Sequence, residues 1–432
     1  MKHRIILSIA LAFAALSWGA TALSDESEVE PDRWTIIHAG TLIAEPGTSP
    51  KKRRTIVIKN DRIDRVVSGY KSASDLESVS DADTIDLKSH YVMPGLMDAH
   101  VHLGLGGDYG QDRSTERGKD TYRLLDVQSN AAKTLDAGYT TVRNVGSYDW
   151  AVFAMRDAVK AGEIVGPRIY SAGHTVKIGT FGSMGSGACF DVTSCRKAVR
   201  RQIDMGADWI KVYVTCSGSK PCGREFAPAV FLQDELQTVI DTAASFQIPV
   251  AAHAHGTDGI NKALGAGARS IEHGSYNNEE SRRLWVENSA YYVPTLAVQD
   301  NIIKDYETAG DDMKPVMEGF MAEHPKRVAA AHEAGVQIAA GSDAGVVPHG
   351  DNANELIWYV KIGMTEAEAL RAATVVNAAL LQKEDDLGTI EAGKYADIIA
   401  MDENPLENIE ALKDIDFVMA AGRVAKDDHE QE

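Results

Sequence analysis

The chain has 432 residues, and 44% of them are hydrophobic, which is enough for a large core and for more than one average domain. Its formal net charge of −19 disfavours nucleic acid and anionic membrane as partners.

The N-terminus has the pattern of a secretory signal peptide. MKHRIILSIALAFAALSWGATALSDES contains a short basic start, an apolar stretch and small residues at Ala20 and Ala22. We expect a signal peptide over residues 1–22 and an exported, periplasmic protein with no membrane segment after cleavage. A retained anchor is the weaker alternative, because the apolar run is short and lacks a basic flank.

Strand patterns lie near both ends of the chain. WTIIHAGTLI and RTIVIKNDRIDRVV follow the signal peptide, and LGTIEAGKYADIIAMDENP and DFVMAAGRVAK come last. They predict a small β-sandwich domain built from residues 34–93 and 386–432. Between them, over residues 94–385, short β-branched segments alternate with helical ones. This alternation predicts an α/β fold, a TIM-type (β/α)8 barrel, with a doubly wound sheet as the alternative.

Two histidine pairs stand on predicted barrel strands. PGLMDAHVHLG places His100 and His102 two residues apart, and AAHAHG does the same for His253 and His255. Side chains at i and i+2 of a strand point to one face, so each pair favours a metal site. His273, in SIEHGS, ends a further predicted strand. Since a barrel gathers the carboxyl ends of its strands at one face, these histidines can converge.

Two more polar residues occupy equivalent positions. Lys211 lies among apolar neighbours in WIKVYVT, and Asp343 follows a strand in AAGSDAG. A buried charged lysine is costly unless it is paired. Lys211 therefore either snorkels or pairs with a carboxylate, or it is carboxylated by carbon dioxide. The two oxygens of the resulting carbamate can bridge two metals. Asp343 is either a turn former or a metal ligand and general base.

The four cysteines lie close together in the sequence, at positions 189, 195, 216 and 222. In an exported protein an even number of cysteines favours disulfides. A zinc site is the alternative, although a spacing of five residues between the first two is unusual for zinc. The glycine-rich stretch that begins at Lys177 lacks the ending of a phosphate-binding loop, and we interpret it as a rim or lid near the site.

The motifs together resemble the amidohydrolase superfamily. PGLMDAHVHLG, WIKVYVT, VAAHAHGTDGINKALGAGARSIEHGS, AAGSDAG and the C-terminal LGTIEAGKYADIIAMDENP carry the resemblance across the mature chain. The branch it resembles most is that of metal-dependent carboxypeptidases and prolidases, which includes ochratoxin-hydrolysing amidohydrolases. The resemblance implies a homo-oligomer and a small-molecule or peptide substrate.

The resemblance also implies a site with two divalent metal ions, zinc or a similar ion. The implied ligands are His100, His102, carboxylated Lys211, His253, His273 and Asp343, and Asp343 also shuttles protons. The two histidine pairs are then unequal, because both rings of the first pair bind metal but only His253 of the second does.

Three residues are expected to contact substrate, namely His174, Tyr213 and His255. Arg224 is a weaker candidate for pairing with a carboxylate. The expected reaction is hydrolysis of the amide bond of an N-acyl amino acid or dipeptide, releasing the C-terminal amino acid, with ochratoxin A among the candidate substrates. The alternatives are hydrolysis of a cyclic amide or lactone and, from another class, a non-catalytic binding barrel.

Overall fold

The computed structural model describes residues 32–79, 81–105, 119–147, 150–179, 187–216, 227–311 and 313–428. The predicted signal peptide, Cys222 and Arg224 lie outside these ranges, as does the middle of the glycine-rich stretch. No helix within the described ranges combines the length and apolar character that a membrane span requires.

A ring of parallel strands forms the larger part of the described chain. Three strands pair in the order β5-β6-β7 and five in the order β10-β11-β12-β13-β14. Parallel bridges join the two sheets on both sides, between Val176 and Val212 and between Val101 and Ala344. The predicted barrel is confirmed. Its strands are β5 (Leu96–Val101), β6 (Tyr139–Asn144), β7 (Arg168–Ser171), β10 (Ile210–Tyr213), β11 (Val250–Ala254), β12 (Ser270–His273), β13 (Tyr291–Val293) and β14 (Gln337–Ile338).

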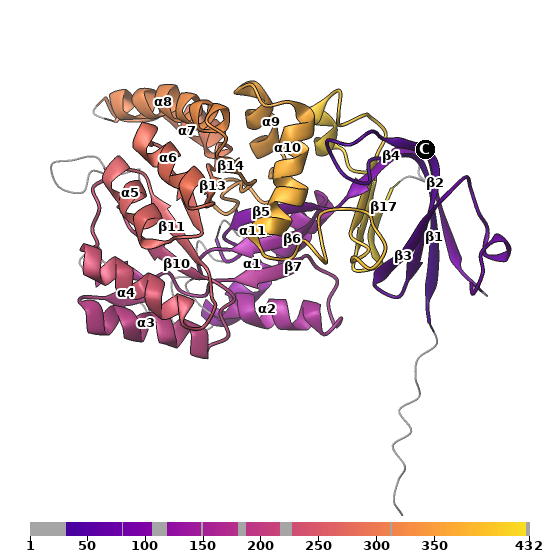
Figure 1. Ribbon diagram of the computed structural model, residues 1–432, viewed down its shortest axis with the longest axis horizontal. Helices are drawn as coiled ribbons and strands as arrows, with labels where there is room; N and C mark the ends of the chain where they lie inside the picture. The colour runs from indigo at the N-terminus through magenta and orange to yellow at the C-terminus, as the bar shows by residue number, and fades with distance from the viewer. Residues whose placement is uncertain are drawn as a thin grey trace, which may run out of the picture. The chain divides into compact units, whose positions relative to one another are not determined.

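Helices lie outside the strands and cover them (Figure 1). α5, for example, buries an apolar face formed by Ile260, Ala263 and Leu264. The helices are α1 (Lys119–Asp136), α2 (Ala151–Lys160), α3 (Val192–Asp204), α4 (Gln233–Ala244), α5 (Thr257–Ala266), α6 (Glu279–Glu287), α7 (Val298–Tyr306), α8 (Lys314–Glu333), α9 (Asn354–Lys361), α10 (Glu366–Arg371) and α11 (Asn377–Leu380). Shorter elements are η1 (Ala73–Asp75), η3 (Ala372–Val376), η4 (Ile409–Lys413) and the strand pair β8 (Lys177–Ile178) and β9 (Ala188–Cys189).

Both ends of the chain contribute to a second sheet, in the order β17-β16-β15-β4-β1-β2-β3. Side chains from opposite ends of this strand order, such as Ile56 and Phe417, pack into one apolar cluster, as expected of the small β domain built from both chain ends. The strands are β1 (Trp34–Leu42), β2 (Lys51–Lys59), β3 (Arg62–Ser68), β4 (Asp83–Pro94), β15 (Ile398–Met401), β16 (Phe417–Ala420) and β17 (Arg423–Asp427).

The long strand β4 explains why the sheet is continuous and how it positions the barrel. β4 pairs with β1 along most of its length and with β15 at its end. It runs through Gly95 directly into β5, which carries His100 and ends just before His102. A Cβ at Gly95 would lie 2.2 Å from Thr140 Oγ1, so this close approach of β5 and β6 requires glycine.

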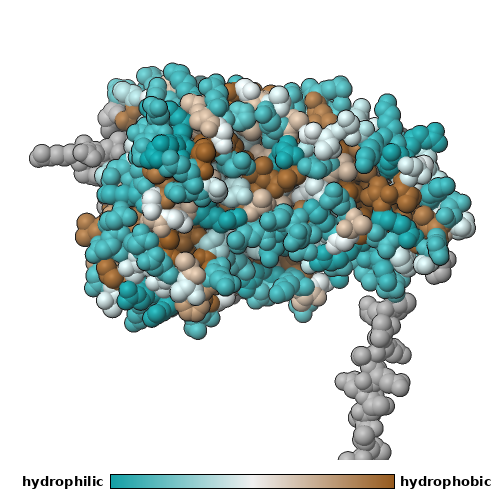
Figure 2. Space-filling model, viewed as in Figure 1, coloured by the Kyte–Doolittle hydropathy of each residue, from teal (hydrophilic) through white to brown (hydrophobic). Residues whose placement is uncertain are grey.

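The face of the molecule shown in Figure 2 is mainly hydrophilic, with smaller hydrophobic patches between the hydrophilic areas.

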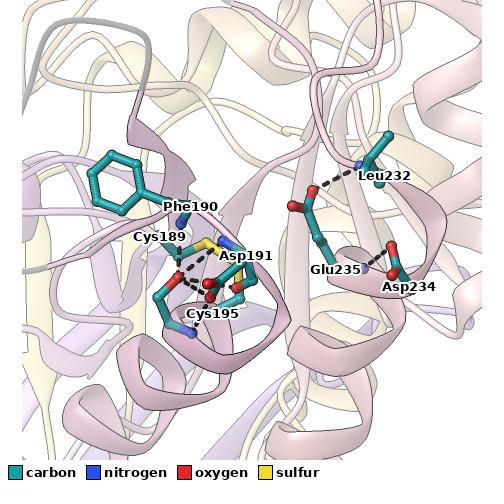
Figure 3. Close-up of a disulfide and its surroundings, with 8 residues drawn as sticks. Cys189, Phe190, Asp191, Cys195, Leu232, Asp234 and Glu235 are labelled. Atoms are coloured by element: carbon teal, nitrogen blue, oxygen red, sulfur yellow. Dashed lines mark hydrogen bonds between the residues drawn. A yellow bond between two sulfur atoms is a disulfide. The ribbon is translucent and has the colours of Figure 1, made fainter.

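A disulfide fixes the start of α3, as Figure 3 shows. Cys189 is bonded to Cys195, and the Asp191 side chain caps the helix by accepting a 2.7 Å hydrogen bond from Ser194 N. Cys216 is also disulfide-bonded. The prediction that these cysteines form disulfides is confirmed for the described ones.

Replacing Cys189 and Cys195 together by serine is expected to lower the free energy of unfolding by about 2 kcal/mol, because the bond closes a short loop in the unfolded chain. Urea denaturation of the variant and the wild type measures the difference. Equal free energies of unfolding in the two proteins would contradict this expectation.

Candidate metal centre

The six predicted ligands converge at the carboxyl ends of the barrel strands. His100 and His273 have ring centroids 4.9 Å apart, and His253 and His273 have theirs 4.6 Å apart. Asp343 Oδ1 lies 3.4 Å from His102 Nε2 and 3.6 Å from His100 Nε2. All six side chains are buried, and His100 and Lys211 are fully inaccessible.

Two of these residues have a backbone conformation that is unusual for their type. His273 has φ 70° and Asp343 has φ 61°, in the left-handed region that side chains with a Cβ seldom adopt. A hydrogen bond of 2.8 Å from Asp343 N to the carbonyl of His100 holds the second of them in place. Such strain persists where the surrounding structure imposes it, and it is common at functional sites.

The hydrogen-bond partners of two rings fix which ring nitrogen is a free base. His102 Nδ1 lies 3.0 Å from the carbonyl oxygen of Gly146, and His253 Nε2 lies 3.4 Å from that of Cys216. A carbonyl can only accept, so the proton of a neutral ring sits on the nitrogen that faces it. Nε2 of His102 and Nδ1 of His253 are left as lone-pair donors.

Among the predicted ligands, four buried polar atoms have no hydrogen-bond partner within the described part of the chain, and they come from four different strands or strand ends. They are His100 Nε2, Lys211 Nζ, His253 Nδ1 and Asp343 Oδ1. Orphaned buried polar atoms are costly, and a bound cation satisfies several of them at once. Imidazole nitrogens with a carboxylate oxygen are a donor set for zinc and similar divalent ions, so these residues fit the metal site expected from the sequence.

Burial sets the charges of the site. It lowers the pKa of His100 and of His102 to about 4, with the nearby Lys211 adding to the effect, so both rings are neutral at pH 7. Burial also lowers the pKa of Lys211 to about 8, against the opposing influence of Glu272 and Asp343. The Asp343 carboxyl has its pKa raised by burial, although His100 and Lys211 act in the other direction.

Two of the predicted substrate contacts lie against the histidines. The Tyr213 ring is 4.3 Å from that of His253 and shares a strand face with Lys211. His255 stacks on His273 at 4.8 Å, and its Nδ1 lies 2.9 Å from Ser275 Oγ. His255 offers a ligand atom within 4.8 Å of those of His253 and His273, so its exclusion from the ligand set stays a prediction.

The third predicted contact, His174, is half-buried and packs against Trp150 with ring centroids 4.6 Å apart. Its segment passes beside His102, because a Cβ built on Gly146 would lie 2.8 Å from Thr175 Oγ1 and 3.4 Å from His102 Cε1. Thr175, the residue that follows His174, therefore lies near His102.

Sequence reasoning missed two buried carboxylates that hold this site. Asp98 accepts hydrogen bonds from His100 N at 2.9 Å, Ser342 Oγ at 2.5 Å and Asn352 Nδ2 at 2.7 Å. Glu272 lies 2.7 Å from His100 Nδ1. Both stand next to or two residues from a predicted ligand, in MDAH and IEHG. An acid in a buried strand beside a histidine is the signal that could have found them.

The strands form a closed parallel barrel, and buried histidines, a lysine and an aspartate gather at their carboxyl ends. This is the face at which barrel enzymes have their active sites. The model of the amidohydrolase family matches residues 91–425. The chain belongs to the amidohydrolase family, as its motifs indicated.

Individual relatives agree. Ochratoxinase of Aspergillus niger is 32% identical over 94% of this chain and 88% of its own length. The crystal structure of a Xaa-Pro dipeptidase with methionine bound in its active site superposes with a TM-score of 0.82 at 34% identity, covering 90% of this chain and 99% of that one. The crystal structure of A. niger ochratoxinase gives a TM-score of 0.77 at 28% identity, with 92% and 96% covered.

Proposed function

We propose that this protein is an exported amide hydrolase with two divalent metal ions, which cleaves N-acyl amino acids or dipeptides and releases the C-terminal amino acid. The observation that carries the proposal is the set of four unpartnered buried atoms, contributed by His100, Lys211, His253 and Asp343. Burying these atoms without partners costs free energy, and in a non-catalytic binding barrel nothing would offset that cost.

In the proposed centre His100, His102, His253, His273 and Asp343 hold zinc or a similar ion, together with a carboxylated Lys211. The metals supply Lewis-acid polarisation of the scissile carbonyl and a nucleophilic hydroxide near neutral pH. Carboxylation joins the Nζ of Lys211 to the carbon of CO2 and releases a proton. The uncharged amine is the reactive form, so a pKa of about 8 favours the reaction compared with an exposed lysine.

We propose that Asp343 transfers protons. We assign it the proton of the attacking water, which it then delivers to the nitrogen of the departing amino acid. We assign Tyr213 and His255, whose rings lie against His253 and His273, to binding the acyl group or the substrate carboxylate, together with His174.

The relatives support this substrate class. One is named an ochratoxinase, and another is a Xaa-Pro dipeptidase that holds an amino acid, methionine, in its active site. We include ochratoxin A among the candidate substrates for this reason. The N-terminal signal pattern and the disulfide-bonded cysteines support export.

Product analysis by mass spectrometry tests the proposal. Purified, zinc-loaded protein is incubated with dipeptides, N-acyl amino acids, ochratoxin A and a panel of cyclic amides and lactones. Release of a free C-terminal amino acid from one of the first three groups is the expected result. Cleavage confined to the cyclic amides or lactones would replace the substrate class, and a metal-loaded protein that cleaves nothing in any group would contradict the proposal.

A further inference from the structure

Glu272 is a fully buried carboxylate whose two oxygens both have partners. Oε2 lies 2.7 Å from His100 Nδ1. Oε1 accepts from Arg143 Nη2 at 2.9 Å and from Ser270 Oγ at 2.5 Å. The proposed reaction gives this residue no part in proton transfer or substrate binding, so its position calls for another explanation.

Arg143 binds Oε1 of this carboxylate, and its own position is fixed by further contacts. Its Nε donates to the carbonyl of Ala99 at 2.6 Å and its Nη1 to Ser270 Oγ at 3.0 Å. The guanidinium lies 4.4 Å from the ring centre of Trp209. A fully buried ion pair gains little stability after the cost of removing both charges from water. We therefore look for its role in positioning, and the group that this pair positions is the ring of His100.

The partner of His100 differs in charge from those of the other predicted histidine ligands. The rings of His102 and His253 face backbone carbonyls, and His273 Nδ1 lies 2.8 Å from the hydroxyl of Thr295. His100 faces a carboxylate whose other oxygen is paired with the Arg143 guanidinium at 2.9 Å. A carboxylate partner fixes the tautomer of a ligating histidine and raises its basicity.

We propose that Glu272 is a positioning residue of the metal centre: held by Arg143, it keeps the proton of His100 on Nδ1 and turns Nε2 to the metal. This inference rests on the proposed function, since it requires metal at these histidines.

Glu272→Gln is the most informative substitution. The amide keeps the size of the side chain but cannot accept from Arg143, Ser270 and His100 at once, because one of its ends is a donor. If the amide nitrogen faces His100, the ring proton is forced onto Nε2 and the metal-binding lone pair is lost. The affinity for one of the two ions is expected to fall by about 10–100-fold.

Chelator competition with elemental analysis of the protein measures this affinity directly, without reference to activity. Thr295→Val is the matched control, because it removes the neutral partner of His273 and should weaken binding less. Glu272→Gln protein that retains both ions as the wild type does would overturn the inference. A wild type that takes up no metal would instead overturn the proposed function.

A second variant and a second measurement allow for a Glu272→Gln protein that does not fold. The double variant Arg143→Met, Glu272→Gln removes both charges, so that no buried guanidinium is left unpaired, and it should show the same loss of affinity. Nitrogen NMR of the histidine rings in metal-free wild type should place the proton of His100 on Nδ1. A proton on Nε2 would overturn the inference whatever the variants do.

Discussion

Replacing Lys211 with alanine is expected to abolish most hydrolysis and leave the protein folded. The substitution removes the proposed bridging ligand, so the loss of metal affinity should exceed the about 10–100-fold that follows loss of an outer partner. The structure explains why we expect the variant to fold. Lys211 Nζ makes no hydrogen bond with the described residues, so the small cavity left by the side chain is offset by removal of a buried amine.

The measurements are kcat/KM on the best substrate, metal content and the unfolding temperature of metal-free protein. Lys262→Ala is the control, because this lysine lies on the surface of α5 and pairs with Asp258 across one helical turn. It should keep wild-type activity. Turnover close to wild type in Lys211→Ala protein would remove this residue from the site.

Replacing Asp343 with asparagine is expected to lower kcat by about 10²–10⁴-fold, the range for loss of a general acid–base group. Asparagine keeps the size of the side chain and tolerates the left-handed backbone at this position, where φ is 61°. It cannot accept and return the proton of water. The loss should therefore appear in kcat more than in the stability of the fold.

Steady-state kinetics of the metal-loaded variant, with metal content measured on the same sample, separates lost proton transfer from lost metal. Asp351→Asn serves as a control, since Asp351 lies exposed in the same connection after β14. Unchanged kcat in Asp343→Asn protein carrying its full metal content would exclude Asp343 as the proton shuttle.

Much of the architecture could be predicted because its signals are local. Several barrel strands are short runs of β-branched or small residues followed by glycine, as in AAHAHG and AAGSDAG. The spacing of His100 and His102 predicts that both rings face one side, and the Nε2 atoms of both lie within 3.6 Å of Asp343 Oδ1. The prediction of a barrel with its polar residues gathered at one face followed from these features alone.

What could not be predicted depends on contacts between distant segments. Nothing local to IEHG says that Glu272 meets His100, which lies 172 residues earlier in the chain. The left-handed backbone of His273, the last residue of β12, could not be predicted either. In a regular strand, the side chains of Glu272 and His273 would simply point to opposite faces. The continuous strand order of the small β domain likewise depends on β4 pairing with both β1 and β15, which no periodicity reveals.

The most direct test of the metal centre is a crystal structure of the metal-loaded protein with anomalous diffraction data collected at the zinc edge. We predict two anomalous peaks among His100, His102, His253, His273 and Asp343, with additional density for a carboxyl group joined to Lys211 Nζ between them. A single peak held by His253, His255 and His273, with a bare amine at Lys211, would contradict the account.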